Sequence, residues 1–258
     1  MSAPALATPI GQHAERPADE RQLRIDLAAA YRLIHHFGMD DTIYTHLSLR
    51  VPGPEHHFLI NPYGMTFDEI TASSLVKIDL DGNPVGDSPW PVNPAGFTIH
   101  SAVHMARDDA PCVMHTHTTA GMAVAAMRRG LLPLNQMSLL FYDRVAYHDY
   151  EGAALDLDER KRIVADLGDK PAMILRHHGL LTVGRTVAEA FYYMYYLEQS
   201  CRLQIAALQT GEELVLVPDE VGRHYRRQES EFESLPKGDR MWPALLRRLD
   251  RIDPSYRD

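Results

Sequence analysis

The order of the expected secondary-structure elements constrains the fold of this chain most, because short strands alternate with helices along it. Apolar spacing predicts helices over about 20–37, 96–107, 119–127, 158–167 and 188–208. Asp19 is placed to cap the first helix, and Thr186 with Glu189 forms a predicted capping box for the last. Strands are expected at 45–51, 56–60, 74–80, 112–117, 172–177 and 179–184. This order predicts one α/β domain built on a mixed sheet.

Three segments follow from composition along the chain. Residues 1–19 are rich in alanine and proline and are expected to be disordered. Residues 20–210 carry the predicted elements without an internal repeat or a clean boundary, so they are interpreted as the domain. Residues 211–258 are charged and irregular in pattern, which favours an arm over a neighbouring molecule or a loosely held tail.

Charge and hydropathy exclude several classes of protein. The formal net charge is −9, so no nucleic-acid partner and no anionic membrane surface is expected. No apolar run approaches the roughly 20 residues that span a bilayer, and the start of the chain lacks the pattern of a signal peptide. The two cysteines, Cys112 and Cys201, lie inside predicted elements, which favours buried, reduced thiols and a cytoplasmic protein.

The stretch CVMHTH at residues 112–117 places two histidines at the end of an apolar strand. Residues i and i+2 of a strand share a face, so His115 and His117 converge. His178 precedes Gly179 at a predicted strand-to-strand turn and could add a third imidazole. Three histidines would leave metal positions open, as in a catalytic site. From these residues alone, ordinary buried histidines with hydrogen-bond partners remain the competing interpretation.

Other candidate motifs are weaker. His100 and His104 are spaced i, i+4 on a predicted helix, but the glutamate of a His-Glu-x-x-His motif is missing. They are interpreted as packing residues or as residues around the site. The sequence holds no glycine-rich phosphate loop, Gly-x-Ser-x-Gly elbow or Cys-x-x-Cys pair.

Three strings together resemble the class II aldolase and adducin head family: NPAGFTIHSAVHMARDDAPCVMHTHTTAGMAVAAM, RVAYHDYEG and ILRHHGLLTVGRTVAEAFYY. The resemblance covers about residues 22–208. It implies a three-layer α/β/α fold with a central mixed, mainly antiparallel sheet, and a homotetramer with active sites between subunits. It also implies that His115, His117 and His178 bind a divalent metal ion, zinc first, with manganese or ferrous iron as alternatives.

Departures from the family pattern bear on the substrate. Gly96 stands where family aldolases carry an acid/base carboxylate. Thr45-His46 and Pro94-Ala95 stand where those aldolases hold a substrate phosphate. The resemblance therefore implies a substrate without phosphate, and the strings NPAGF and VAYHDYEG are closer to the adducin-like branch of the family.

The leading hypothesis is a metal-dependent lyase that acts on a small, non-phosphorylated oxo- or hydroxy-acid by aldol cleavage or decarboxylation. Tyr142 is the candidate proton donor, and Glu198 is a weaker acid/base candidate. One alternative is a non-catalytic, adducin-like assembly module. A second is a non-haem iron oxygenase acting on an aromatic acid, with Met137, Leu139 and Phe141 around an apolar pocket or a subunit interface.

Overall fold

The computed structural model describes residues 19–152, 158–232 and 236–258. The segment 1–19, expected to be disordered, lies outside these residues except for Asp19. The helices are α1 (Glu20–His36), α2 (Pro94–Ala106), α3 (Thr119–Ala125), α4 (Gln136–Leu139), α5 (Glu159–Leu167), α6 (Val187–Gln209), α7 (Asp219–Phe232) and α8 (Trp242–Ile252), followed by the 3-10 turn η1 (Pro254–Arg257). The strands are β1 (His46–Arg50), β2 (Phe58–Ile60), β3 (Val76–Ile78), β4 (Cys112–Thr116), β5 (Val145–His148), β6 (Ala172–Leu175) and β7 (Gly179–Gly184).

The strands form one sheet in the order β3-β2-β1-β4-β7-β6-β5. Every neighbouring pair is antiparallel except β5 and β6, which are parallel. The predicted mixed, mainly antiparallel sheet is therefore confirmed. β4 is the central strand, hydrogen-bonded to β1 on one side and to β7 on the other.

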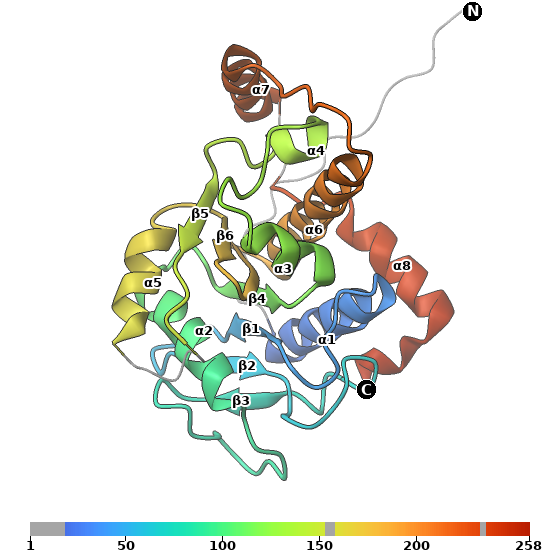
Figure 1. The fold of residues 1–258 in the computed structure, drawn as a ribbon. Coiled ribbons are helices and arrows are strands. Elements are labelled where there is room, and N and C mark those ends of the chain that lie inside the picture. Colours follow the sequence, from blue (N-terminus) through green and yellow to red (C-terminus); the bar gives the residue numbers. More distant parts are fainter. Residues whose placement is uncertain (1–18, 153–157, 233–235) are drawn as a thin grey trace, which may run out of the picture.

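Helices cover both faces of this sheet, which gives the three layers (Figure 1). Alternate residues of β4 divide between two buried clusters, as the strand period of two requires. Cys112 and Met114 pack into the cluster with α1, α3 and α6. Val113 packs into the cluster with α2 and α5. His115 has the parity of Val113, so its side chain lies on the face that α2 and α5 cover.

The first helix begins and ends where the sequence predicts. The Asp19 side chain accepts a hydrogen bond from the backbone N–H of Arg21, and Gly38 leaves the helix with a φ of 62°. Thr186 likewise caps α6 by accepting from Glu189 N–H. The Glu189 carboxylate binds the backbone N–H of Arg185 rather than that of Thr186, so the predicted capping box is only half formed.

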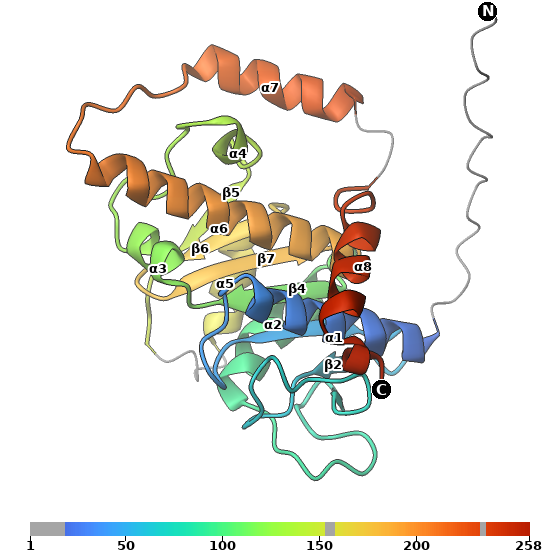
Figure 2. The same ribbon diagram turned by 90° about the vertical axis from the view of Figure 1, so that its right-hand side faces the viewer.

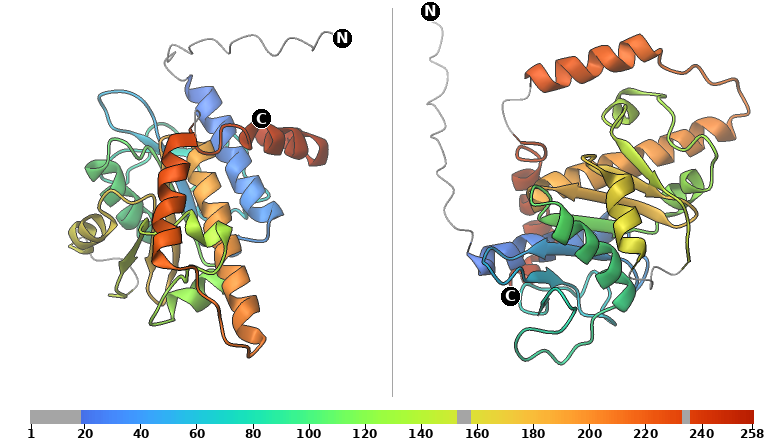
Figure 3. Two further views of the ribbon diagram at one scale, coloured as in Figure 1. Left: turned by 90° about the horizontal axis from the view of Figure 1, so that it is seen from above. Right: turned by 90° about the vertical axis from the view of Figure 1, so that its left-hand side faces the viewer.

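The prediction of an irregular segment over residues 211–258 is wrong, because α7 and α8 lie within it. α8 packs against α1, with the Trp242 ring 5.7 Å from Phe191 and its indole N–H donating to Asp26. α8 is amphipathic, with Trp242 and Leu249 buried. The charged residues on its outer face make the segment polar on average, so its composition does not indicate a packed helix. Unlike α8, α7 does not pack against α1 in the described part of the chain. It lies along the side of α6 away from the sheet (Figures 2 and 3). Among the described residues, no helix is long and apolar enough to cross a membrane.

Replacing Trp242 tests whether the last helix belongs to the core. Trp242 is 8% exposed, and Trp90, the other tryptophan, is 40% exposed. We expect Trp242→Ala to lower the free energy of unfolding by about 3–5 kcal/mol, because a large buried side chain is lost. Urea denaturation followed by circular dichroism measures this loss, with Trp90→Ala as the matched control. An equal, small effect of both variants would contradict the packing of α8.

Candidate metal centre

The three predicted metal-ligand histidines meet at one end of the central strands. The ring centroids of His115, His117 and His178 are 4.7–4.8 Å apart. One nitrogen of each ring lies within 4.8 Å of a nitrogen of the other two. His115 lies in β4, His117 directly follows this strand, and His178 lies in the turn between β6 and β7. The structure thus brings together residues more than 60 positions apart in sequence.

Hydrogen bonds fix which nitrogen of two of these rings carries a proton. His115 Nδ1 lies 2.9 Å from the carbonyl oxygen of Leu180, which can only accept, so Nδ1 donates. His117 Nδ1 lies 3.1 Å from a carboxylate oxygen of Asp41 and donates in the same way. The neutral form of each ring then has an unprotonated Nε2. A carbonyl or carboxylate partner on the other nitrogen is the usual arrangement of a metal-binding histidine.

The two unprotonated nitrogens face each other. His115 Nε2 and His117 Nε2 are 2.9 Å apart. Two nitrogen lone pairs at this distance repel, unless a cation or a shared proton lies between them. The donor set of three imidazoles suits zinc and iron ions, and it leaves further positions of the metal open. The residues present therefore fit a divalent metal ion.

Gly179 allows the third histidine to approach. A Cβ atom added at this position would lie 2.3 Å from the carbonyl oxygen of Thr116, 3.1 Å from the His117 ring and 3.3 Å from the His115 ring. A side chain here would push β7 away from the end of β4. The His-Gly pair of the sequence is therefore needed for the backbone to pass close to the other two ligands.

A second group of buried polar side chains lies beside the centre on the same face of the sheet. His46 pairs with His115 in the β1–β4 ladder, and their rings are 5.2 Å apart. The ring of His46 lies 4.3 Å from that of His100 on α2. Ser48 Oγ contacts His100 Nδ1 at 2.6 Å and His104 Nε2 at 2.7 Å. The prediction that His100 and His104 pack around the site is thus confirmed.

Several polar atoms of this group have no hydrogen-bond partner within the described part of the chain. They are Thr45 Oγ1, both ring nitrogens of His46, His100 Nε2 and His104 Nδ1. Buried polar atoms are usually satisfied, so an unpartnered set beside a candidate site points to a ligand or to water.

Burial favours the uncharged form of His46, His115 and His178. Desolvation lowers the pKa of His46 to about 3 and that of His178 to about 4, with smaller contributions from neighbouring histidines. The pKa of His115 is also lowered, first by desolvation and then by His178 and His117. Metal binding requires the neutral form of imidazole, so these shifts favour it.

A hollow close to His178 has a volume of about 480 Å³. His177, Tyr150, Asp149 and Arg176 are among the residues that line it. The Tyr150 ring lies 6.3 Å from the His178 ring. A small organic molecule in this hollow would therefore be next to the third histidine.

The two predicted acid/base residues, Tyr142 and Glu198, contact residues other than the three histidines. The backbone of α7 closes over the Tyr142 ring at Gly222, and the Tyr142 hydroxyl hydrogen-bonds to Asp219. Glu198 is buried on α6, where Thr118 donates to one carboxylate oxygen and Arg202 donates to the other at 2.6 Å. Glu198 therefore braces the segment that follows His117, which favours a positioning role.

Sequence reasoning missed Asp41, which orients His117. Asp41 lies in a loop after α1, in the string MDDT. The sequence does not show whether Asp40 or Asp41 would contact a histidine of the site. The unpartnered state of His46 could not be predicted either, because it depends on pairing between strands distant in sequence. Gly96, which by the family resemblance stands in place of the acid/base carboxylate of the aldolases, lies in the first turn of α2.

Comparisons with known proteins show the family of this chain. Residues 25–205 match the family described as "Class II Aldolase and Adducin N-terminal domain". Alpha-adducin of Mus musculus is 44% identical over 249 residues, which are 90% of this chain and 34% of that protein.

Two solved structures are also similar. An aldolase II superfamily protein from Pseudomonas syringae has a TM-score of 0.88 at 53% identity, covering 93% of this chain and 96% of that one. The L-fuculose 1-phosphate aldolase from Glaciozyma antarctica has a TM-score of 0.81 at 28% identity, covering 97% of both chains.

The buried histidines make stability depend on pH. Burial lowers the pKa of His104 to about 3, from an unfolded value of 6.5. Below pH 6.5 the unfolded chain therefore binds a proton that folded His104 excludes, and stability falls as the pH falls toward the folded value. We expect His104→Gln to reduce the slope of unfolding free energy between pH 6.5 and 4 by about 1.4 kcal/mol per pH unit. Urea denaturation at several pH values measures the slope, with exposed His36→Gln as control. An unchanged slope in His104→Gln would contradict burial of a neutral ring.

Proposed function

This chain belongs to the class II aldolase and adducin N-terminal domain family, and we propose that it is a metal-dependent carbon–carbon lyase. Its substrate is a small oxo- or hydroxy-acid without a phosphate group, cleaved by aldol cleavage or decarboxylation. The observation that carries the proposal is the pair of unprotonated His115 and His117 nitrogens, held 2.9 Å apart beside His178.

His115, His117 and His178 would hold the metal ion, with zinc as the first choice and manganese or ferrous iron as alternatives. When bound, such an ion supplies Lewis-acid stabilisation of the negative charge that develops on a substrate oxygen. The protein contributes the orientation of the ligands. Asp41 and the Leu180 carbonyl hold two of the rings with their Nε2 atoms inward.

The neighbouring polar group supports a substrate without phosphate. Thr45 Oγ1, the His46 ring and His100 Nε2 offer unpartnered hydrogen-bonding atoms. Burial keeps the pKa of His46 near 3, so its ring is neutral at pH 7. Neutral groups suit hydroxyl and carbonyl oxygens, whereas a phosphate dianion is usually held by cations or by backbone N–H groups. The relative from Glaciozyma antarctica, by its name, acts on a phosphorylated sugar, and we expect the two proteins to differ here.

Tyr142 remains the candidate proton donor, in an active site between subunits. Desolvation, followed by the hydrogen bond to Asp219 and its charge, raises the pKa of the Tyr142 phenol, so the group keeps its proton at neutral pH. Its ring contacts Gly222 and its hydroxyl contacts Asp219, both of α7, and we propose that it serves the three histidines of a neighbouring copy in a homotetramer. It would protonate the carbanionic carbon left when the bond breaks.

The similarity to alpha-adducin supports a second candidate, a non-catalytic assembly module. A third is an iron-dependent oxygenase, which the same three histidines could serve.

We propose a cytoplasmic location for the protein. The two buried free thiols, Cys112 and Cys201, support it.

The test is turnover by metal-loaded protein on a panel of small oxo- and hydroxy-acids and their phosphorylated counterparts, scored by carbonyl product and carbon dioxide. We expect turnover of a non-phosphorylated acid, a loss of at least roughly a hundredfold in His115→Ala and Tyr142→Phe, and no loss in the exposed His56→Ala control. Mixing the first two variants should restore activity, if the site lies between subunits.

Each other outcome has a distinct meaning. No turnover under any metal would contradict the lyase and leave the assembly module. Preference for a sugar phosphate would contradict the substrate class, and oxygen consumption with ferrous iron would favour the oxygenase. Failure of the two inactive variants to complement each other would remove Tyr142 from a shared site.

A further inference from the structure

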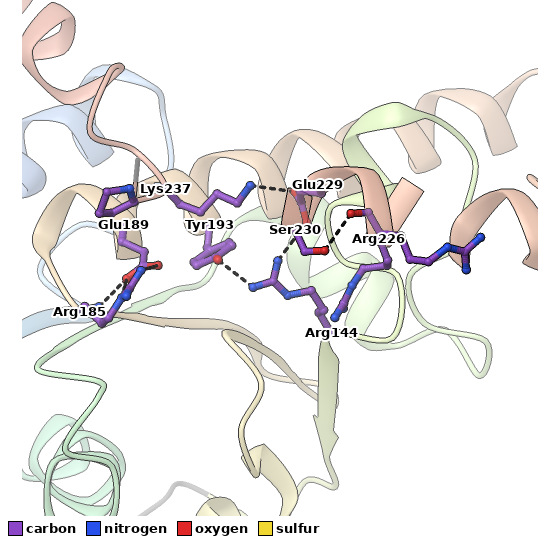
Figure 4. Close-up of a pocket in the computed structure, with 10 residues that line it drawn as sticks. Arg144, Arg185, Glu189, Tyr193, Arg226, Glu229, Ser230 and Lys237 are labelled. Carbon is purple, nitrogen blue, oxygen red and sulfur yellow. Dashed lines mark hydrogen bonds and ion pairs between the residues drawn. The ribbon is translucent and has the colours of Figure 1, made fainter. Parts of the chain in front are cut away.

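A second hollow lies between α6 and α7 (Figure 4). Its volume is about 670 Å³, within the range of pockets that bind small molecules. Glu189 and Tyr193 of α6 line it from the side that faces away from the sheet, and Arg226 and Glu229 of α7 line it from the other. None of the three histidines lines this hollow, and His115 lies on the other face of the sheet, which α2 and α5 cover, so the hollow is not part of the metal centre.

The lining is strongly cationic in a chain whose net charge is −9. Arg144, Arg185, Arg226, Arg227 and Lys237 line the hollow, against the carboxylates of Glu189 and Glu229. Among the described residues that line it, cations outnumber carboxylates. A hollow lined by one sign of charge attracts ions of the other sign.

One carboxylate is shared between two of the cations. Glu229 accepts from Arg144 at 3.2 Å and from Lys237 at 3.0 Å, and the Glu229 and Lys237 side chains are both 11% exposed. Arg144 also donates to the Tyr193 hydroxyl at 2.9 Å. These bonds hold two cationic groups in fixed positions beside the hollow (Figure 4).

Arg226 adds a further cation from α7. Its guanidinium donates to the backbone carbonyl of Tyr142 at 3.0 Å, and within the described residues no carboxylate pairs with it. The remaining donors of this guanidinium are available to a ligand, and a guanidinium can bind two oxygens of a phosphate group at once.

We propose that this hollow binds a small polyanion, a metabolite that carries one or more phosphate groups. Arg144, Lys237 and Arg226, which line the hollow, contact its phosphate oxygens. Bound there, the ligand joins α7 to α6. Without it, α7 is held to the rest of the chain by contacts near Tyr142.

The test is isothermal titration of the full chain with pyrophosphate, and separately with inorganic phosphate and adenosine diphosphate, at constant ionic strength. Titrations are repeated in His115→Ala, which removes a metal-centre ligand, so that failure of the lyase proposal does not affect the result. We expect saturable binding of pyrophosphate at one site per chain, equal in both proteins. Arg226→Gln should weaken it by at least about tenfold, because a charged hydrogen bond is lost. Arg223→Gln, on the same helix but outside the lining, should not.

Lys237→Gln is a second variant, in case Arg226→Gln disturbs the packing of α7. The three probes separate the sources of the ligand: phosphate alone, a diphosphate, or a nucleotide with its base. Absence of saturable binding, binding lost in His115→Ala, or equal weakening by Arg226→Gln and Arg223→Gln would overturn the proposal. Binding seen only after the subunits dissociate would also overturn the proposal. It would mean that a second copy of the chain occupies the hollow in the assembled protein.

Discussion

The antiparallel ladder of β1, β4 and β7 is the constraint on which the rest of the structure depends. It places His46 opposite His115, and His115 opposite Leu181, so the register of three strands decides which side chains meet. A shift of one residue in β4 would turn His115 to the face of α1 and α6 and send Met114 to the metal centre. The close approach at Gly179 completes this arrangement, since β7 must start beside the end of β4.

The same ladder buries polar groups at a cost to stability. His46, His100 and His115 are at most 4% exposed, and several of their ring nitrogens lack partners among the described residues. A fold that needed only a hydrophobic core would place apolar side chains at these positions. The facing nitrogens of His115 and His117 would repel each other unless a cation or a shared proton lies between them. The cost is understandable if this end of the sheet is built for a metal ion and an oxygen-rich molecule beside it.

Much of the fold could be predicted from sequence, because its signals are local. The cap at Asp19, the alternation in β4 and the Thr186 cap each act within a few residues. The three metal ligands could be proposed from two short motifs and a family resemblance. Asp41 and the unpartnered state of His46 could not, since both depend on contacts across the sheet. The helices of the C-terminal segment were missed because charge on the outer face of α8 hides the stripe that carries Trp242 and Leu249.

The central claim is that the three histidines bind a metal ion together, and anomalous scattering from a crystal of protein purified without chelator tests it most directly. Data collected on both sides of the zinc, iron and manganese absorption edges identify the ion and locate it. We expect one ion per chain, about 2.0–2.1 Å from a nitrogen of each of His115, His117 and His178 if the ion is zinc. An empty centre after soaking with all three metals, or an ion bound elsewhere while these rings keep their present contacts, would contradict it.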